Sequence, residues 1–188
     1  MASIALTAVA GVNCNKRAGV KALYLIKTSE ITDIVCGTTS HDITDITFGS
    51  VGVGFGKINF KRGECEVTES GERSNTATVN FAVPNPNAAQ RFELEAISKQ
   101  CELYAVAELY DNERLLFVGY DSIGEDESFL SYTSNESTSG KAQEDDNLFS
   151  MVLTATQSEI LRVVTGLSGV SATTKTAIIA ELVAATNV

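Results

Sequence analysis

Alternating apolar and polar residues on both sides of a short polar segment form the clearest pattern in this chain. The apolar residues fall on odd positions and are Cys65, Val67, Ala77, Val79, Phe81 and Val83. The polar residues fall on even positions and are Glu64, Glu66, Thr68, Thr76, Thr78 and Asn80. This period of two is expected of strands with one buried face. Residues 70–75, Ser-Gly-Glu-Arg-Ser-Asn, have the composition of a turn, so we predict a β-hairpin.

A helix is predicted directly after this hairpin. The sequence Pro-Asn-Pro-Asn at residues 84–87 stops the second strand, because proline cannot donate to a β-ladder. Asn85 is the expected N-cap and Pro86 the first helical residue, and the helix is expected to run to about Lys99. Its apolar side is predicted to comprise Ala89, Phe92, Ala96 and Ile97.

Two further strands are predicted at residues 103–110 and 114–120, joined by the polar turn Asp-Asn-Glu. The second of them is apolar on both faces, because Leu115 and Phe117 alternate with Leu116 and Val118. A strand of this kind is covered on both sides. We therefore expect it to be a central strand of a sheet.

The segments before this region are predicted to be strands joined by loops. Residues 20–26 are a compact apolar run, and residues 31–36 and 43–48 show weaker strand patterns. Residues 49–56, Gly-Ser-Val-Gly-Val-Gly-Phe-Gly, lack the lysine of a phosphate-binding loop. Glycine at this density within strand patterns indicates a bend or sheet edge where backbone segments approach closely.

The later part of the chain changes character twice. Residues 122–146 are mostly polar and are predicted as a long exposed loop. Residues 148–156 alternate again, and their apolar face comprises Phe149, Met151, Leu153 and Ala155. The pattern at residues 157–165 is compatible with an extended strand or with a helix. After the glycines at 166–169, Ser171 is the expected cap of a helix to about Thr186, whose apolar side is Ile178, Ile179, Leu182 and Val183.

These elements predict one mainly β domain at residues 20–156, between an N-terminal arm at 1–19 and a C-terminal extension at 157–188. We expect a β-sandwich or a barrel-like closure with one flanking helix and a C-terminal helix. The arm is apolar and requires a surface to cover it, either on its own domain or on a neighbouring molecule. The same two alternatives apply to the terminal helix.

Composition excludes several classes of function. The 188 residues are 44% hydrophobic and 20% charged, as in a globular protein, and the formal net charge is −10. A chain this acidic is a poor match for proteins that grip nucleic acid or anionic membranes. The apolar N-terminus has no positive segment before it and no window of about 18 apolar residues follows, so neither a signal peptide nor a membrane span is predicted.

Candidate chemical groups are few and scattered. The cysteines at 14, 36, 65 and 101 form no close pair, so buried or structural free thiols are favoured over a metal site or disulfides. His41 lies in a polar loop, and the acidic residues Asp121, Glu125, Asp126 and Glu127 lack the spacing of a calcium-binding loop. No motif of nucleophilic, metal-dependent or nucleotide-dependent catalysis is present. We therefore predict no enzyme activity, no catalytic residue, no metal and no cofactor.

The order of motifs resembles a known family. The segments VKALYLIKTSEITDI, PNPNAAQRFELEAI, CELYAVAEL, RLLFVGYDS and DNLFSMVLTAT follow one another, with an Asp-Asn turn before the fourth. In this order they resemble the tail tube and related tail-completion proteins of Bacteroidetes phages and prophages, over most of residues 20–156. The polar segment 122–146 and the terminal helix lie outside the matched part.

This resemblance implies a virion structural protein that assembles with itself. In that family the subunits, commonly six, form a ring around a central pore, and the rings stack into a tail tube that conducts DNA without binding it specifically. Assembly is then expected in the host cytoplasm, with other tail or neck proteins as partners and no membrane contact. The alternatives are a neck or tail-terminator protein, a capsid decoration protein, or a ligand-binding β-sandwich, although the aromatic platform of a carbohydrate binder is poorly supported because tryptophan is absent.

Overall fold

The computed structural model describes residues 19–38, 41–71, 74–110, 114–122, 128–138, 147–167 and 174–185. The predicted arm before Gly19, Cys14, the turn at 111–113, the acidic residues 125–127 and the predicted cap Ser171 lie outside these ranges.

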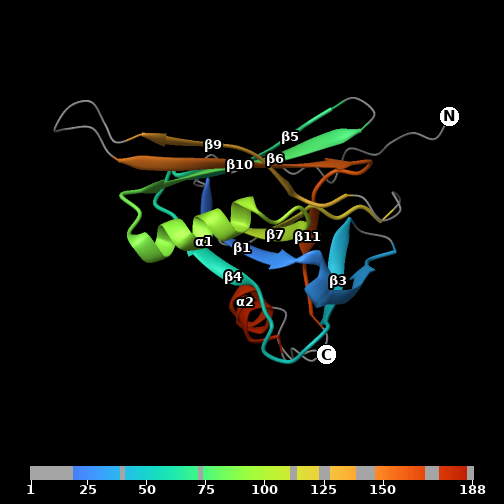
Figure 1. The fold of residues 1–188 in the computed structure, drawn as a ribbon. Helices are drawn as coiled ribbons and strands as arrows, with labels where there is room; N and C mark the ends of the chain where they lie inside the picture. The colour runs from blue at the N-terminus through green and yellow to red at the C-terminus, as the bar shows by residue number, and fades with distance from the viewer. Residues whose placement is uncertain are drawn as a thin grey trace.

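Two β-sheets pack face to face, and the fold is mainly β as the sequence predicted (Figure 1). The seven-stranded sheet has the order β2-β3-β11-β8-β7-β1-β4. Its strands are β1 (Val20–Lys27), β2 (Ile31–Cys36), β3 (Asp42–Phe48), β4 (Gly56–Asn59), β7 (Leu103–Leu109), β8 (Leu115–Val118) and β11 (Arg162–Val164), with the 3-10 turn η2 (Thr28–Glu30) between the first two. Strand β8 is fourth of seven, so the prediction of a central strand is confirmed.

The four-stranded sheet has the order β5-β6-β10-β9 and is antiparallel throughout. Its strands are β5 (Cys65–Ser70), β6 (Asn75–Pro84), β9 (Ser131–Thr138) and β10 (Leu148–Gln157). The predicted hairpin is confirmed by β5 and β6, where Cys65 lies opposite Phe81 and Val67 opposite Val79.

The prediction that residues 122–146 form one long loop is wrong in part, because β9 lies within it. Strand β9 pairs with β10 from Leu148↔Thr138 to Thr154↔Ser131. Six of its eight residues are exposed, as expected of a strand at the edge of a sheet with a polar sequence on both faces. The alternation that reveals a half-buried strand is therefore missing from its sequence.

Apolar side chains from the inward faces of both sheets form the core between them. The seven-stranded sheet contributes Leu23, Leu25, Ala105, Ala107 and Val118, and the four-stranded sheet contributes Cys65, Ala77, Val79, Phe81, Met151, Leu153 and Ala155. The odd-numbered residues of β5, β6 and β10 thus point inward, as their alternation predicted. Fully burying a large apolar side chain stabilises the fold by about 1.5–3 kcal/mol.

A second core lies on the opposite face of the seven-stranded sheet, where helix α2 (Lys175–Ala184) covers it (Figure 1). Ile178 and Leu182 of the helix are buried against this face, together with Phe48, Phe55 and Phe117. The expected C-terminal helix is confirmed and packs on its own sheet. The predicted cap Ser171 is wrong, because the N-cap is Thr174, whose side chain accepts from the Ala177 amide. Val183, assigned to the apolar side by sequence, is 46% exposed.

Helix α1 (Ala88–Ser98) lies beside the open side of the sandwich and begins two residues later than predicted. Its N-cap is Asn87, whose side chain accepts from the Gln90 amide while the Gln90 side chain accepts from the Asn87 amide. Asn85, the predicted cap, has a φ of 47° and belongs to the preceding turn. Leu94 is the buried residue of the helix, whereas Phe92, placed on the apolar side by sequence, is 73% exposed. Because only a narrow strip of the helix contacts the sheets, the fold does not need the apolar side of four residues that the sequence predicted.

The glycine-rich segment at residues 49–56 confirms the expected close approach of backbone segments. A Cβ atom on Gly54 would lie 2.3 Å from the carbonyl oxygen of Val183 in α2. The adjacent Phe55 amide donates to the carbonyl of Leu182 at 2.8 Å. Glycine at 54 therefore lets this loop lie directly against the end of the C-terminal helix.

Candidate assembly site

The four-stranded sheet has two open edges, formed by β5 and β9. Each of these strands pairs with one neighbour among the strands that the structure describes. Edge strands present unpaired main-chain N–H and C=O groups that can pair with another chain. These edges are therefore candidates for contacts between copies of the protein.

The register of the ladder shows which residues point outward at each edge. Asn85 N donates to Asn147 O at 2.6 Å, so these opposite residues are a hydrogen-bonded pair of the β6–β10 ladder. Such pairs recur at every second residue, so the odd residues of β10 bond to β6 and its even residues bond to β9. Because Val152 lies opposite Ser134 and Ser150 opposite Glu136, the main-chain groups of Asn135 and Ser137 point away from the sheet.

The same reasoning applies at the opposite edge. Ala82 N donates to Glu64 O at 2.7 Å, so the even residues of β5 bond to β6. The main-chain groups of Val67 and Glu69 consequently point toward the open side of β5. The Glu69 side chain turns back and accepts from the amide of Leu161 at 3.1 Å.

Two common protective residues of edge strands, lysine and proline, are missing from both edges. Natural edge strands are often blocked by lysine, proline or an inward-pointing charge. The sequences Cys-Glu-Val-Thr-Glu-Ser of β5 and Ser-Tyr-Thr-Ser-Asn-Glu-Ser-Thr of β9 contain neither lysine nor proline. Neither edge is blocked by lysine or proline, although the β9–β10 pair has a register shift between Val152 and Leu153 and Glu69 lies on the inward side of β5.

The outward face of this sheet is mostly polar, and its charges are negative. Its central residues are Thr76, Thr78, Asn80, Ser150 and Thr154, with Ala82 and Val152 among them, Glu66 on β5 and Glu136 on β9. The Glu66 carboxylate accepts from the Asn80 side chain at 3.4 Å, and the hydroxyls of Thr133 and Thr154 lie 2.7 Å apart. None of the four strands contains lysine or arginine. A polyanion therefore finds hydroxyl groups but no cation on these strands.

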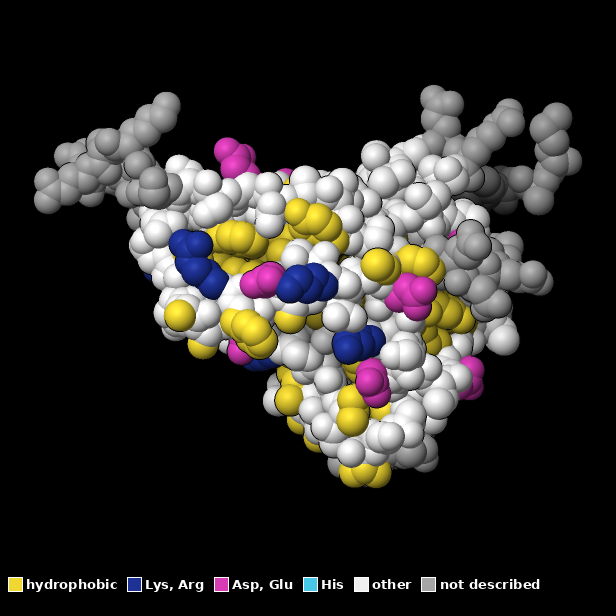
Figure 2. All heavy atoms as spheres, viewed as in Figure 1, with side chains coloured by type: hydrophobic (Ala, Val, Ile, Leu, Met, Phe, Trp, Pro, Cys, Tyr) yellow, Lys and Arg dark blue, Asp and Glu magenta, His cyan; other side chains and the backbone are white. Residues whose placement is uncertain are grey.

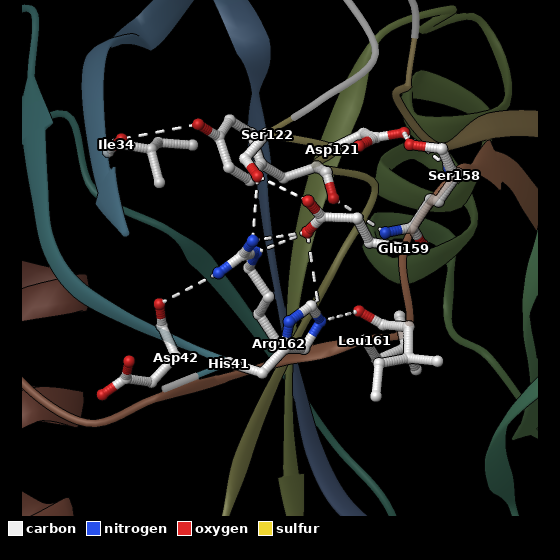
Figure 3. Close-up of polar contacts among 12 residues, drawn as sticks. Ile34, His41, Asp42, Asp121, Ser122, Ser158, Glu159, Leu161 and Arg162 are labelled. Carbon is white, nitrogen blue, oxygen red and sulfur yellow. Dashed lines mark hydrogen bonds and ion pairs between the residues drawn. The ribbon is translucent and has the colours of Figure 1, made fainter. Parts of the chain in front are cut away.

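A buried polar network fixes the corner where the chain passes from β10 into β11 (Figure 3). The Asp121 carboxylate, which follows β8, accepts from both the amide and the hydroxyl of Ser158 at 2.5 Å. Arg162 donates from Nε to Glu159 Oε2 at 2.8 Å and from Nη2 to Ser122 Oγ at 2.8 Å. The network thus holds the end of the four-stranded sheet against the centre of the seven-stranded one.

The contacts of this network are those of a structural site. Ser122 Oγ donates to Glu159 Oε1 at 2.6 Å, and His41 Nε2 lies 2.6 Å from the carbonyl oxygen of Ile160 and 4.0 Å from Glu159 Oε2. Both serine hydroxyls are directed at carboxylates, and the histidine is not hydrogen-bonded to either of them. The arrangement holds the backbone segments of this corner together.

Tyr120 extends the same corner toward β2. Its hydroxyl donates to the carbonyl of Ile34 at 3.5 Å, and its own carbonyl accepts from Gln157 Nε2 at 2.8 Å. Burial, followed by the nearby Cys36 thiol, raises the pKa of Tyr120 to about 12. The phenol therefore stays a neutral donor over the physiological range.

A second buried charge, Glu108 of β7, ties α2 to the seven-stranded sheet. Glu108 is 3% exposed and accepts from Lys21 Nζ at 2.9 Å and from Tyr24 Oη at 3.0 Å. Lys175 Nζ, at the start of α2, lies 3.4 Å from the same carboxylate and donates to the carbonyl of Leu109 at 3.1 Å. Burial raises the pKa of Glu108, but the hydrogen bonds from Lys21 and Tyr24 and the charge of Lys175 outweigh it, so the pKa is lower than its ordinary value.

A groove of about 760 Å³ lies between α1, the edge of β4 and the end of β6. Its apolar lining includes Ile58 and Phe60 next to β1, Val83 from β6, and Leu94 and Ile97 from α1. Figure 2 shows exposed hydrophobic side chains on this face above and below a row of basic and acidic side chains. The groove runs beside the open edge of β4, the last strand of the seven-stranded sheet.

The structure separates most of the residues that the sequence singled out. Asp121 lies in the buried network, whereas the other acidic residues of its set lie outside the described ranges. Cys65 is buried, Cys36 is half-buried and Cys101 is exposed, and all three are free thiols. In the part of the chain that is described, no group of three or more His, Cys, Asp or Glu side chains is placed to hold a metal ion. None of the described helices is long and apolar enough to cross a membrane.

Sequence reasoning did not identify the two buried charge clusters. Glu108 is the single charge in the apolar strand Leu-Tyr-Ala-Val-Ala-Glu-Leu, and a charge at such a position is a usable signal of a buried partner. Glu159 and Arg162 are three residues apart, but their segment could not be assigned to a helix or a strand. The sequence spacing of these two residues therefore did not indicate that they form a buried ion pair.

Comparison with known proteins gives no further guide to the family. No protein-family model matches this sequence, and no significant similarity was found to a curated protein or to a solved structure.

Proposed function

We propose that this protein is a virion structural protein that assembles with itself into rings, and that the rings stack into a phage tail tube through which DNA passes. The observation that carries this proposal is the four-stranded sheet with its two open edges. Four antiparallel strands place β5 and β9 in opposite directions. When neighbouring copies of a ring have the same orientation, β9 of one copy lies antiparallel to β5 of the next. The antiparallel order of strands then continues around the ring.

Such a contact uses different surfaces on the two partners. Heterologous contacts of this kind generate closed rings when the rotation closes and helical filaments when it does not. Closure also removes every unpaired edge of the sheet, which an isolated copy cannot do. Six copies would form a closed sheet of about 24 strands, larger than the barrels of about 16–18 strands that already leave an aqueous channel.

The outward face of the four-stranded sheet is a suitable lining for a DNA channel. Nonspecific affinity for DNA comes mainly from lysine and arginine contacts with phosphates. These strands present hydroxyl groups, Glu66 and Glu136, and contain no basic residue. DNA would be repelled weakly and would not be retained on the wall.

The same open edges are compatible with a neck, tail-terminator or capsid decoration protein, which also function as repeated copies. A ligand-binding β-sandwich is the alternative from another class, and the groove beside α1 is the observation that favours it. Solitary copies that bind a small ligand in this groove would distinguish that function from ring formation.

The proposal is tested by electron microscopy and light scattering of the purified full chain, with variants in β9. Asn135→Pro removes an N–H that points away from β10, so the ladder within one copy is kept while the open edge is blocked. Asn135→Ala is the matched control. We expect rings or tubes for the parent chain and for Asn135→Ala, and solitary folded copies for Asn135→Pro.

Two results would overturn the proposal. One is a parent chain that stays monomeric at concentrations where tail proteins assemble. The other is a folded Asn135→Pro variant that forms the same rings as the parent. A urea unfolding curve for each variant establishes that a loss of rings is not a loss of folding.

A further inference from the structure

The groove beside α1 has the geometry of a site for an additional β-strand. Phe60 N donates to Lys21 O at 3.0 Å, which identifies the residues of β4 that bond to β1 as 56, 58 and 60. The main-chain groups of Lys57 and Asn59 therefore point away from β1, toward the groove. An extended segment lying there would bond to this edge and place alternate side chains between β4 and α1.

The groove suits a small, uncharged, apolar segment. Its walls combine partly buried Ile58 and Ile97 with the more deeply buried Phe60 and Leu94. Their exposed remainder is apolar surface that no described residue covers. The charged residues among its lining, Lys27, Lys57, Glu64 and Glu93, are balanced in sign, and the Lys57 ammonium lies over the Tyr24 ring.

The N-terminal arm has the matching sequence. Residues 2–10 read Ala-Ser-Ile-Ala-Leu-Thr-Ala-Val-Ala, carry no charge and contain an apolar residue at every even position. The odd positions include Ser3 and Thr7. In an extended conformation, Ile4, Leu6 and Ala8 would share one face. That face could enter the groove while the polar residues stay toward solvent.

The path of the chain favours the groove of a second copy over the arm's own groove. The described chain enters β1 at Val20, beside the end of β4 where Lys21 contacts Phe60. At that same end residues 61–64 turn toward β5, with Glu64 N donating to Lys61 O at 3.2 Å. To reach its own groove, the arm would have to cross this connection, and connections rarely cross at one edge of a sheet. Eighteen residues extend to about 60 Å, enough to reach a neighbour.

We propose that residues 2–10 of one copy add a β-strand to the open edge of β4 in a second copy, with their even-numbered side chains in the groove beside α1. This inference rests on the proposed function, because assembly is what brings a second copy within reach. It adds a contact separate from the β5–β9 edges.

Disulfide trapping between two full-length chains tests the proposal. One chain carries Ala96→Cys, an exposed position of α1 that lines the groove. The other carries Leu6→Cys, and Cys14→Ser and Cys101→Ser are introduced into both. Cys36→Ser is also introduced into both chains, which leaves the buried Cys65 as the remaining native thiol. After mixing and mild oxidation, a disulfide between the two different chains then reports an arm in the groove of another copy.

The alternation of the arm supplies the matched control. Cysteine at Ile4, Leu6 or Ala8 is expected to cross-link several-fold more than cysteine at Ala5 or Thr7. An excess of a synthetic peptide of residues 2–12 is expected to reduce this cross-link.

Three results would overturn the inference: no cross-link, equal cross-linking at even and odd positions, or cross-linking only within one chain that carries both cysteines. Electron microscopy of the same mixtures separates this inference from the proposed function. Rings without a cross-link contradict the arm contact alone, whereas a cross-link without rings supports the arm contact and contradicts ring assembly.

Discussion

The guanidinium of Arg162 and the carboxylate of Glu159 form an ion pair whose side chains are 9% and 8% exposed. Both groups lie at the corner between the two sheets, where Ser122 bonds to each of them. A buried ion pair contributes little net stability when intact, but the loss of one partner leaves the other charge buried and unpaired. This corner is therefore sensitive to the removal of a single partner.

Replacing Arg162 with methionine is expected to lower the free energy of unfolding by about 3–5 kcal/mol. Glu159 would keep its contact with Ser122 but lose its counter-charge. In the double variant Arg162→Met, Glu159→Met most of this loss is expected to be recovered, because neither charge of the pair is left buried without its partner. Urea unfolding of the parent, both single variants and the double variant measures the coupling.

The exposed ion pair on α1 provides the comparison. Lys99 and Glu95 are 68% and 61% exposed, and exposed pairs contribute little to stability. Lys99→Met should therefore leave the unfolding midpoint unchanged. An equal loss in Lys99→Met and Arg162→Met would contradict the importance assigned to burial.

Glu108 makes the stability of the fold dependent on pH. Its folded-state pKa is lower than the ordinary value of 4.5, because the contacts with Lys21, Tyr24 and Lys175 outweigh burial. The stabilisation is therefore complete above pH 4.5 and is lost as the pH falls through the lower folded-state pKa. Glu108→Gln is expected to cost about 1–3 kcal/mol at neutral pH.

The measurement is the difference in unfolding free energy between the parent and Glu108→Gln from about pH 7 to about pH 3. This difference should shrink on acidification. Glu93→Gln, which changes an exposed carboxyl of α1, is the matched control variant. A constant difference for Glu108→Gln would show that its charge does not stabilise the fold.

The strands that could be predicted from the sequence are those in which the pattern of apolar and polar residues shows which faces are buried. The odd residues of β5, β6 and β10 face the core because each strand has one covered face, and β8 is apolar on both faces because it is central. Strand β9 and the buried charges could not be predicted in this way. The pairing of β9 with β10 and the contact of Arg162 with Ser122 join residues that are distant in sequence.

The helix ends show a related limit of local reasoning. Asn85 and Asn87 are both acceptable caps next to Pro86, and local preference alone does not choose between them. Gln90 completes a reciprocal capping box with Asn87. The Asn85 amide donates to the carbonyl of Asn147, which lies directly before β10.

Gly54 is expected to be required for the packing of α2. A Cβ atom there would lie 2.3 Å from the Val183 carbonyl oxygen and 2.6 Å from that of Leu182. Gly54→Ala should therefore force the loop and the helix apart, at a cost of about 1–3 kcal/mol in the free energy of unfolding. Gly56→Ala is the matched control, because its Cβ would meet the Leu25 carbonyl oxygen at an ordinary 3.6 Å. Thermal or urea unfolding that ranks the two variants equally would contradict this account.

The cysteines are expected to differ in reactivity according to their burial. Cys65 is 3% exposed, and burial, together with the charge of Glu66, raises its pKa to about 12, whereas Cys101 is exposed. A thiol reacts as its thiolate, so Cys65 should resist alkylation in the folded protein.

Mass spectrometry after a short exposure to iodoacetamide at neutral pH measures this difference. Cys101 should be modified in the folded protein, and Cys65 only after unfolding in urea. Because the pKa of Cys65 is raised, its contribution to stability is complete below the ordinary value of 9.0 and is lost as the pH rises from there toward about 12. Equal labelling of Cys65 and Cys101 in the folded protein would show that the space between the two sheets is open to solvent, which would contradict the face-to-face packing that directs the polar side of the four-stranded sheet outward.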